Sequence, residues 1–282
     1  MQQKHQERSL PHTYSQRPVA SPTWNGRPQD ILWRGGAVHF EAPQGIPAYT
    51  ELHTHFAIQV TIGIQHHLVA VRSRRDAQKR IAGGWLIASN QPHLIQSDGG
   101  YVTIFLDPLS ANGLRVKGRL GDAGVLALSP DESQAAEREF TSLQSEWSVD
   151  AVQPAIERVL LLLAPRAAAI PKLDFRVQAV VNELNADSSE HVSLKVLAAG
   201  ARLSESRLAH LFSRDVGLPI RQYHLSLRMH EAITQIASGK SLTDSAHIAG
   251  FTDSSHFCRI CKRMFGSTPS GLPDFALKKD SR

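Results

Sequence analysis

Three histidines and one glutamine form the first group of side chains that could carry chemistry. His53 and His55 come immediately before an apolar run, Phe56–Ile64, which contains Gln59, and His93 follows further along the chain. Imidazole nitrogens can bind a metal ion, line an effector pocket with hydrogen-bonding groups, or serve only the protein's own packing. A neutral glutamine is a poor ligand for a divalent metal. These interpretations stay open, but we predict neither a metal site nor a cofactor.

Basic side chains near the C-terminal end form the second group. Arg259 could pair with a guanine through two parallel hydrogen bonds, which discriminates between bases by roughly 1–3 kcal/mol. Lys262 and Arg263 are better suited to holding phosphates. Such contacts require a helix that presents these side chains to a DNA groove. Without such a helix, a solvated surface charge is the alternative interpretation of Arg259.

Length and composition limit the classes of protein to consider. A chain of 282 residues, with 41% apolar and 20% charged residues, suggests two globular domains. The formal net charge of +5 is compatible with nucleic acid binding without proving it. Cys258 and Cys261 are too few for a disulfide framework, and one such pair on a helix is a poor zinc site. Because the chain lacks long apolar runs and a signal peptide, we expect a cytoplasmic protein without membrane contact.

The elements that must position both groups differ between the two halves of the chain. Short apolar runs interrupted by Gly, Pro, Asn and Asp over residues 31–128 predict a small β-barrel or sandwich. Helices are expected over 131–147 and 152–163, with Pro154 in the first turn of the latter, and throughout the chain from residue 173. The predicted class is therefore α+β with two domains. The expected divisions are a flexible tail (1–28), an effector-sensing β domain (29–129), a helical dimerisation region (130–163), a linker (164–172) and an all-α DNA-binding domain (173–282).

A repeated unit organises the C-terminal domain. Residues 194–204 resemble residues 242–252, and each copy follows a serine placed as an N-cap, Ser193 or Ser241. A turn with a glycine, Gly200 or Gly250, is expected to end each short helix. The hydroxyl side chains of Ser204 and Thr252 would then cap the helices that follow.

Each copy continues with a second helix that carries an apolar stripe and ends at a glycine. The stripes are Leu208, Leu211 and Phe212 before Gly217, and Phe257, Ile260 and Cys261 before Gly266. A short helix, a tight turn and a striped helix make a helix-turn-helix unit, whereas a plain helical hairpin is the alternative for either copy alone. A connecting helix over 220–238, about 28 Å long, would place the two recognition helices about one DNA turn, roughly 34 Å, apart.

The second copy, Ala249–Ser270, resembles the signature of the AraC/XylS family of bacterial regulators almost position by position. The first copy, Leu203–Pro219, follows the same pattern, and the resemblance covers residues 173–275. Cys261 departs from the usual phenylalanine, and Gly271–Leu272 replaces a position that is commonly aromatic. The resemblance implies a sequence-specific DNA-binding transcription regulator. It also implies a homodimer formed through residues 130–163, for which packing on the β domain is the alternative, and possible activation through RNA polymerase.

The resemblance and the helix faces together nominate the side chains that contact DNA. They are Ser206, Ala209 and His210 in the first unit, and Ser254, Ser255, Cys258, Arg259, Lys262 and Arg263 in the second.

The front half resembles a cupin barrel, and the ligand-sensing domain that usually precedes an AraC-type domain, over residues 35–108. Gln59 stands where the cupin pattern has a glutamate. An effector site is therefore predicted from a few polar groups and an aromatic wall: Trp33, His53, His55, Gln59, Trp85, His93 and Tyr101. The predicted function is a transcription regulator that responds to a small molecule and is not an enzyme. The alternatives are a metal-dependent cupin enzyme fused to a DNA-binding domain, and a regulator whose barrel serves only as a dimer scaffold.

Overall fold

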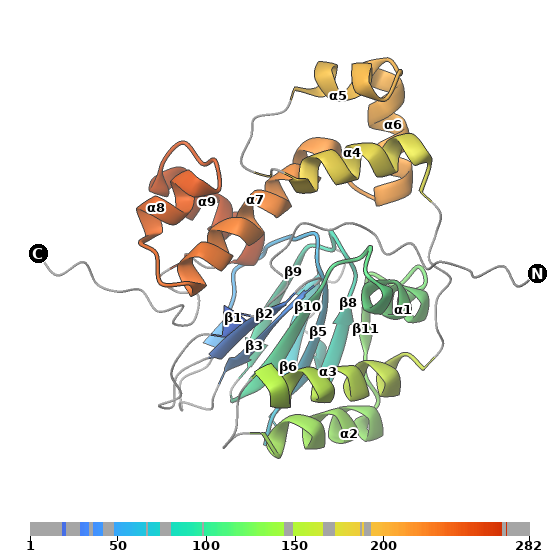
Figure 1. Cartoon of the computed structure of the whole chain (residues 1–282). Coiled ribbons are helices and arrows are strands. Elements are labelled where there is room, and N and C mark those ends of the chain that lie inside the picture. Colours follow the sequence, from blue (N-terminus) through green and yellow to red (C-terminus); the bar gives the residue numbers. More distant parts are fainter. Residues whose placement is uncertain are drawn as a thin grey trace, which may run out of the picture.

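A computed structural model describes most of the chain. The described residues are 19–20, 29–33, 36–41, 48–65, 67–73, 80–97, 99–143, 149–165, 173–186, 188, 193–266 and 269. The predicted α+β class with two domains is confirmed, because strands dominate the first half and helices the second (Figure 1). Most of the expected tail, and residues 166–172 of the expected linker, lie outside the described residues.

The strands of the first half, which we call the β domain, form two antiparallel sheets. One sheet has the order β1-β2-β3-β10-β5-β8-β11, and the other has the order β4-β9-β6-β7. Val19–Ala20, inside the expected flexible tail, forms β1 and pairs with β2. The strand bounds are β1 Val19–Ala20, β2 Gln29–Trp33, β3 Gly36–Glu41, β4 Ala48–Tyr49, β5 Ile58–Gly63, β6 Val69–Ser73, β7 Arg80–Ala82, β8 Gly84–Ile87, β9 His93–Ser97, β10 Tyr101–Leu106 and β11 Val125–Ala127.

The larger sheet is apolar on its outer face, and three helices cover that face. Alternate residues of a strand point to opposite faces, so Val102, Ile104 and Leu106 of β10 join Val60 of β5 in the core beneath the helices. The helices are α1 Ala111–Leu120, α2 Pro130–Thr141 and α3 Val149–Leu163, which lie along one side of the sheet in Figure 1. The opposite face of the same sheet turns toward the smaller sheet, and it carries the polar residues discussed below.

The helices of the β domain differ from the prediction in three respects. Helix α1 was not predicted, although Ser110 accepts a hydrogen bond from Gly113 N–H as its N-cap. Helix α2 ends at Thr141 instead of residue 147. Helix α3 begins three residues earlier than expected, so Pro154 lies inside it rather than in its first turn. The missing N–H of Pro154 therefore removes one hydrogen bond from the interior of that helix.

Helix α3 divides its apolar residues between two environments. Val159, Leu160 and Leu163 are fully buried in the core under the larger sheet, whereas Leu161 and Leu162 are 49% and 43% exposed. The helix therefore packs on the β domain, which was the alternative to packing on a partner. Two of its leucines remain on the outer surface.

Helices α4 to α9 make up the C-terminal domain, in which α7 joins the two units (Figure 1). Their bounds are α4 Phe175–Ala186, α5 Leu194–Gly200, α6 Glu205–Val216, α7 Ile220–Ala237, α8 Leu242–Ile248 and α9 Ser254–Phe265. Ser193, Ser204 and Ser241 act as the predicted N-caps, each accepting a backbone N–H three residues later. The predicted stripes are buried in two clusters, one for each unit.

Two details of the predicted turns are wrong. Asp253, not Thr252, caps α9, because its carboxylate accepts the N–H of His256. In the first unit Gly200 is still helical, and the left-handed position is occupied by Arg202, with a φ of 54°. Gly250 takes the equivalent position of the second unit, with a φ of 75°. The repeats therefore share one turn geometry, built with a glycine in only one of them.

Polar contacts join α7 to its neighbours. Tyr223 accepts a hydrogen bond of 2.8 Å from Asn185 of α4. Arg228 donates from Nε to the carbonyl of Ala249 over 2.9 Å, and from its Nη2 to the carbonyl of Gly250. The guanidinium carbon also lies 4.5 Å from the centre of the Phe251 ring. Arg228 thus fastens the turn of the second unit to the connecting helix. Among the described residues, no helix is both long and apolar enough to cross a membrane.

Candidate DNA-binding and effector sites

Helix α6 presents a polar face opposite its buried stripe. Leu208, Leu211 and Phe212 are almost fully buried, which turns Ser206 and His210 to the surface and leaves Ala209 partly exposed. The hydrogen bond from Arg207 N–H to the Ser204 hydroxyl and the left-handed Gly217 define the two ends of this helix. Its first turn is therefore ordered and exposed, as a recognition helix requires.

Helix α9 has the same arrangement with more positive charge. Phe257, Ile260 and Cys261 are buried, and the opposite side carries the six residues nominated from the sequence. Of these, Ser255, Arg259, Lys262 and Arg263 are exposed, whereas Ser254 and Cys258 are partly exposed. Burial raises the pKa of the Cys261 thiol, and also that of Cys258, which keeps both thiols protonated. Cys261 is thus a core residue.

The C-terminal end of α9 contacts the β domain. The carbonyl of Gly266 accepts the N–H of Glu51 over 3.1 Å, and Lys262 Nζ lies 2.8 Å from the Glu51 carboxylate. A Cβ atom at Gly266 would lie 2.5 Å from the Glu51 carbonyl oxygen, so this position requires a glycine. Phe265 lies beside His55 and Phe105, with both centroid distances at 6.3 Å. We call this contact the docking seam.

The first unit also contacts the β domain. The side-chain amide of Asn90 donates to the carbonyl of Gly217 over 3.5 Å. The rings of Phe56 and Tyr223 meet edge to face at 5.6 Å. Both helix-turn-helix units are therefore held against the β domain in this arrangement.

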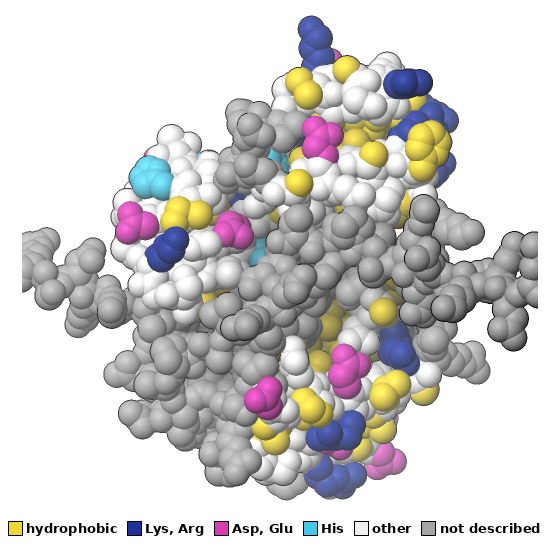
Figure 2. Space-filling view, viewed as in Figure 1, with side chains coloured by type: hydrophobic (Ala, Val, Ile, Leu, Met, Phe, Trp, Pro, Cys, Tyr) yellow, Lys and Arg dark blue, Asp and Glu magenta, His cyan; other side chains and the backbone are white. Residues whose placement is uncertain are grey.

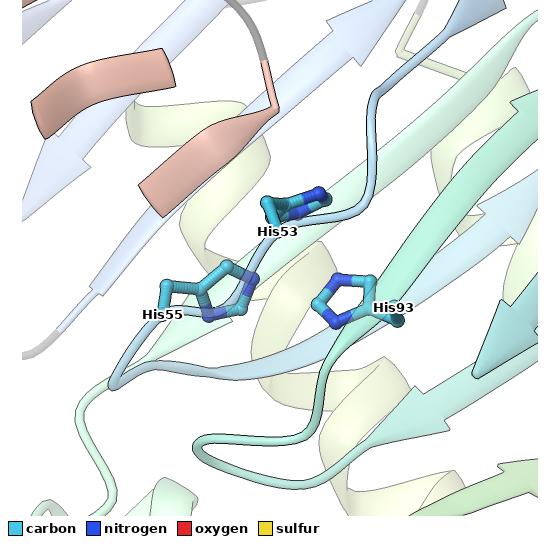
Figure 3. Close-up of side chains that lie close together, drawn as sticks. All are labelled: His53, His55 and His93. Atoms are coloured by element: carbon cyan, nitrogen blue, oxygen red, sulfur yellow. The ribbon is translucent and has the colours of Figure 1, made fainter. Parts of the chain in front are cut away.

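The structure brings together four of the seven predicted effector-site residues. His53 and His93 exchange backbone hydrogen bonds of 2.9 and 3.0 Å. His55 lies on the segment that leads into β5, and Gln59 lies in β5 itself. One ring nitrogen from each of His53, His55 and His93 lies within 4.8 Å of the others, and all three residues are buried. Figure 3 shows the three rings clustered, with His53 and His55 on one segment and His93 on its neighbour. We call His53, His55 and His93 the histidine cluster.

The side chain of Gln59 contacts two rings of the histidine cluster. Its Oε1 is 2.8 Å from His55 Nε2 and 3.0 Å from His93 Nε2. Its Nε2 donates to the Thr61 hydroxyl over 2.8 Å, and Thr61 lies 3.0 Å from the Thr103 hydroxyl. Because of burial, these polar groups depend on one another for hydrogen bonds.

Burial controls the charge of the histidine cluster. Desolvation lowers the pKa of His53 to about 3, with a further decrease from the neighbouring His55. The pKa of His93 is well below its ordinary value for the same reason, and that of His55 is lowered mainly by burial. The rings are therefore neutral at neutral pH, so each offers one nitrogen lone pair.

The histidine cluster fits a transition metal ion by its donor set. Three neutral imidazoles suffice as the protein ligands of a zinc ion, whereas Ca²⁺ and Mg²⁺ require mostly oxygen ligands. With bonds of about 2.1 Å to tetrahedral ligands, zinc-binding nitrogens lie about 3.4 Å apart. The ring nitrogens of His53, His55 and His93 lie within 4.8 Å of one another, so the rings would have to move closer together to hold such an ion. The sequence argued against a metal site because Gln59 is neutral. The meeting of three buried histidines favours such a site.

The predicted aromatic wall lies elsewhere in the β domain. Trp85 is buried and donates from Nε1 to the carbonyl of Val69 over 2.8 Å, and it shares an apolar cluster with Tyr101 and Ile95. This cluster fills the space between the two sheets, so both aromatics are core residues on the inward face. The side chain of Trp33 lies outside the described residues.

Sequence reasoning missed the residues that connect the two sites. Glu51 and Phe265 bring the end of α9 to the histidine cluster, and Arg228 fastens the second turn. Gly266 was predicted as a helix stop, but its close approach to Glu51 was not. Long-range contacts of this kind leave no local pattern, because each partner is an ordinary surface residue in its own segment.

A tandem helix-turn-helix domain behind a β domain is the class that this geometry defines. Residues 197–272 match a protein-family model described as a helix-turn-helix domain. The chain is 30% identical over 98 residues to the uncharacterized HTH-type transcriptional regulator YidL of Escherichia coli K12, covering 34% of this chain and 33% of YidL. It is 32% identical over 98 residues to the HTH-type transcriptional activator RhaS of Yersinia pestis, covering 34% of this chain and 36% of RhaS. These matches confirm a helix-turn-helix domain over residues 197–272 and agree with the resemblance noted in the sequence, and the chain spans about a third of the length of the curated relatives it matches.

The solved structure of apo ToxT from Vibrio cholerae has the same overall fold. The two agree with a TM-score of 0.58 at 12% sequence identity, covering 84% of this chain and 96% of that chain. A structure of ToxT with a bound unsaturated fatty acid agrees with a TM-score of 0.51 at 13% identity, covering 84% and 94%. The likeness extends through both halves and confirms the two-domain arrangement.

Proposed function

We propose that the protein is a sequence-specific DNA-binding transcription regulator. The observation that carries this proposal is the pair of matched units, in which α6 and α9 bury one stripe and expose a polar face. Helix α7 spans 18 residues, about 27 Å. This length suits two recognition helices that enter successive major-groove segments about 34 Å apart. The named relatives, YidL and RhaS, are transcription regulators, which supports the same proposal.

The two recognition helices are expected to contribute differently. Arg259 is the residue of α9 best suited to reading a guanine, and Lys262 and Arg263 lie toward its C-terminal end for phosphates. Helix α6 offers Ser206, Ala209 and His210, which suit weak polar contacts and a thymine methyl group. We propose that α9 supplies most of the binding free energy.

A gel-shift titration of the Arg259→Ala variant tests this proposal. Losing a paired contact to guanine should weaken binding to a selected DNA site by about 5- to 150-fold, the equivalent of 1–3 kcal/mol. Binding to random DNA should change by less than about threefold, because nonspecific affinity comes mainly from phosphates. An equal loss on both DNAs would make Arg259 a phosphate contact. No binding of the unaltered protein to any selected DNA would refute the function.

We further propose that the β domain senses an effector. ToxT, which shares the fold, has been solved with an unsaturated fatty acid bound. In this chain the inward face of the β domain carries buried polar groups, such as Gln59 and His93, that can form hydrogen bonds to an effector. An effector that binds one arrangement of the two domains better would shift the population of DNA-competent molecules. The effect of candidate ligands on thermal unfolding tests for such a site.

Dimerisation through helix α3 is part of the proposal. Leu161 and Leu162 are about half exposed on its outer side, and Figure 2 shows apolar side chains among basic ones over α2 and α3. We expect Leu161→Glu with Leu162→Glu to shift sedimentation toward a monomer, because a buried pair of carboxylates would oppose association. Unchanged sedimentation would place any dimer interface elsewhere. Activation through RNA polymerase rests on the family resemblance alone.

The enzyme alternative has less support. The curated relatives named above are transcription regulators, so we propose a non-enzymatic role for the histidine cluster.

A further inference from the structure

The histidine cluster shows a single tautomer on all three rings. The Nδ1 atoms of His53, His55 and His93 lie 2.8, 2.9 and 2.7 Å from the carbonyl oxygens of Glu51, Ala57 and Gln91. A carbonyl oxygen can only accept, so each Nδ1 carries the proton and each Nε2 of a neutral ring carries a lone pair. Hydrogen bonds of this type from the far ring nitrogen to the main chain orient the histidines of metal sites.

Hydrogen bonds within the chain do not satisfy all of these lone pairs. The side-chain oxygen of Gln59 faces the Nε2 atoms of His55 and His93, which places acceptor against acceptor. Turning the amide would let its NH₂ group donate to those two rings, with Thr61 donating to the oxygen. His53 is 5% exposed, so water can reach its second ring nitrogen. A cation bound to the three rings would use the same lone pairs.

The docking seam lies directly against this cluster. Gly266 approaches so closely that a Cβ atom there would lie 2.8 Å from His53 Nδ1. The carbonyl of Glu51 accepts from His53 Nδ1–H, while the N–H of the same residue donates to Gly266. The peptide groups of Glu51 thus link the orientation of the His53 ring to the position of α9.

We propose that the histidine cluster binds a divalent transition metal ion, such as Zn²⁺, and that the bound ion holds α9 in the docking seam and thereby weakens DNA binding. This inference rests on the proposed function and names the chemical class of its effector. Nitrogen-rich sites select ions of the zinc, cobalt, nickel and copper group over Mg²⁺ and Ca²⁺.

The coupling follows from two competing uses of one side chain. In the docking seam Lys262 pairs with the Glu51 carboxylate at 2.8 Å, so the same ammonium group is not available to a DNA phosphate. The carboxylate itself would repel a phosphate at that position. Metal binding favours the orientation of His53 that the docked α9 stabilises, and linkage requires that DNA weaken metal binding by the same factor.

Binding of Co²⁺ and Zn²⁺ to the untagged, chelator-treated full chain tests the site. We expect one Co²⁺ per chain, with visible absorption bands typical of nitrogen ligands, and displacement by Zn²⁺. His93→Ala should abolish this binding, whereas the control His247→Ala, at an exposed position on α8, should not change it. Gln59→Glu should tighten binding at least tenfold by adding a negative ligand. No stoichiometric binding, or equal binding by His93→Ala, overturns the proposal.

Gel shifts with the same samples test the coupling. Zn²⁺ should weaken binding to a selected DNA site by about 5- to 150-fold, the usual range for coupled sites, and His93→Ala should not respond. Glu51→Gln, which removes the ion pair at an exposed position, should reduce the response to Zn²⁺. If metal binds but DNA affinity is unchanged, the regulatory part is wrong. If the metal-free chain binds no DNA at all, the proposed function fails, independently of the metal result.

Discussion

Arg228→Met should loosen the second helix-turn-helix unit without unfolding the first. The substitution removes hydrogen bonds to the carbonyls of Ala249 and Gly250 and the contact with the Phe251 ring, but it keeps an apolar stem of similar length. A hydrogen bond from a charged donor contributes about 1.5–3 kcal/mol, and a cation–π contact about 0.5–1 kcal/mol. Gly250 is exposed, so water can replace the hydrogen bond to its carbonyl. Ala249 is fully buried, so its carbonyl would be left without that hydrogen bond. The expected loss is therefore about 2–4 kcal/mol.

Hydrogen exchange measures this loss locally. The N–H groups of Gly250 and Phe251 donate to His247 and Ala246 across the turn of the second unit. Their protection should fall by about 30- to 1,000-fold, since each 1.4 kcal/mol is a factor of ten. Arg221→Met, at an exposed position on the same helix, is the matched control and should change little. Protection within threefold of the unaltered protein, or an equal fall in the strands of the β domain, would refute the role assigned to Arg228.

Three further predictions concern the turns and the pH dependence. Arg202→Gly should stabilise the first unit by about 0.5–1 kcal/mol, because a side chain in the left-handed region costs more than the added chain entropy of glycine. Gly250→Ala should destabilise the second unit by about 1 kcal/mol, and urea unfolding followed by helical circular dichroism checks both, with opposite signs expected. Burial lowers the pKa of His230 to about 4, below its unfolded value near 6.5, so its stabilising effect is complete above pH 6.5 and is lost as the pH falls toward 4. His230→Gln should therefore flatten the decrease in unfolding free energy between pH 7 and pH 5, and an identical slope in both proteins would contradict this account.

The sequence predicted the C-terminal domain well because its signals are local. The serines before α5, α6 and α8 and the glycines after α6 and α9 act within one turn, and the apolar stripe requires only a helical period. The failures there are also local. The turn was predicted at Gly200 because glycine favours turns, but the residue with left-handed backbone is Arg202. Asp253 was overlooked beside Thr252, because both side chains can cap a helix.

The β domain and the docking seam were harder to predict. Helix α1 contains Gly113 and Gly118, which weaken its helical signal, and packing against the sheet compensates for their cost. The short spacing of His53 and His55 marked them as candidates, but their meeting with His93 depends on strand pairing. The contact of Glu51 with Lys262 joins residues more than two hundred positions apart, and neither side chain is unusual in its own segment.

The arrangement of protein contacts on DNA tests the central claim most directly. A site selected from random DNA should be probed by interference with modified guanines, at a stated salt concentration, with the unaltered chain and with Arg259→Ala. Two tandem recognition helices predict two blocks of major-groove contacts on one face of the DNA, centred about 10 base pairs apart. Arg259→Ala should lose the guanine signal in one block and retain the other. A single block of contacts, or contacts restricted to phosphates throughout, would contradict recognition by two units.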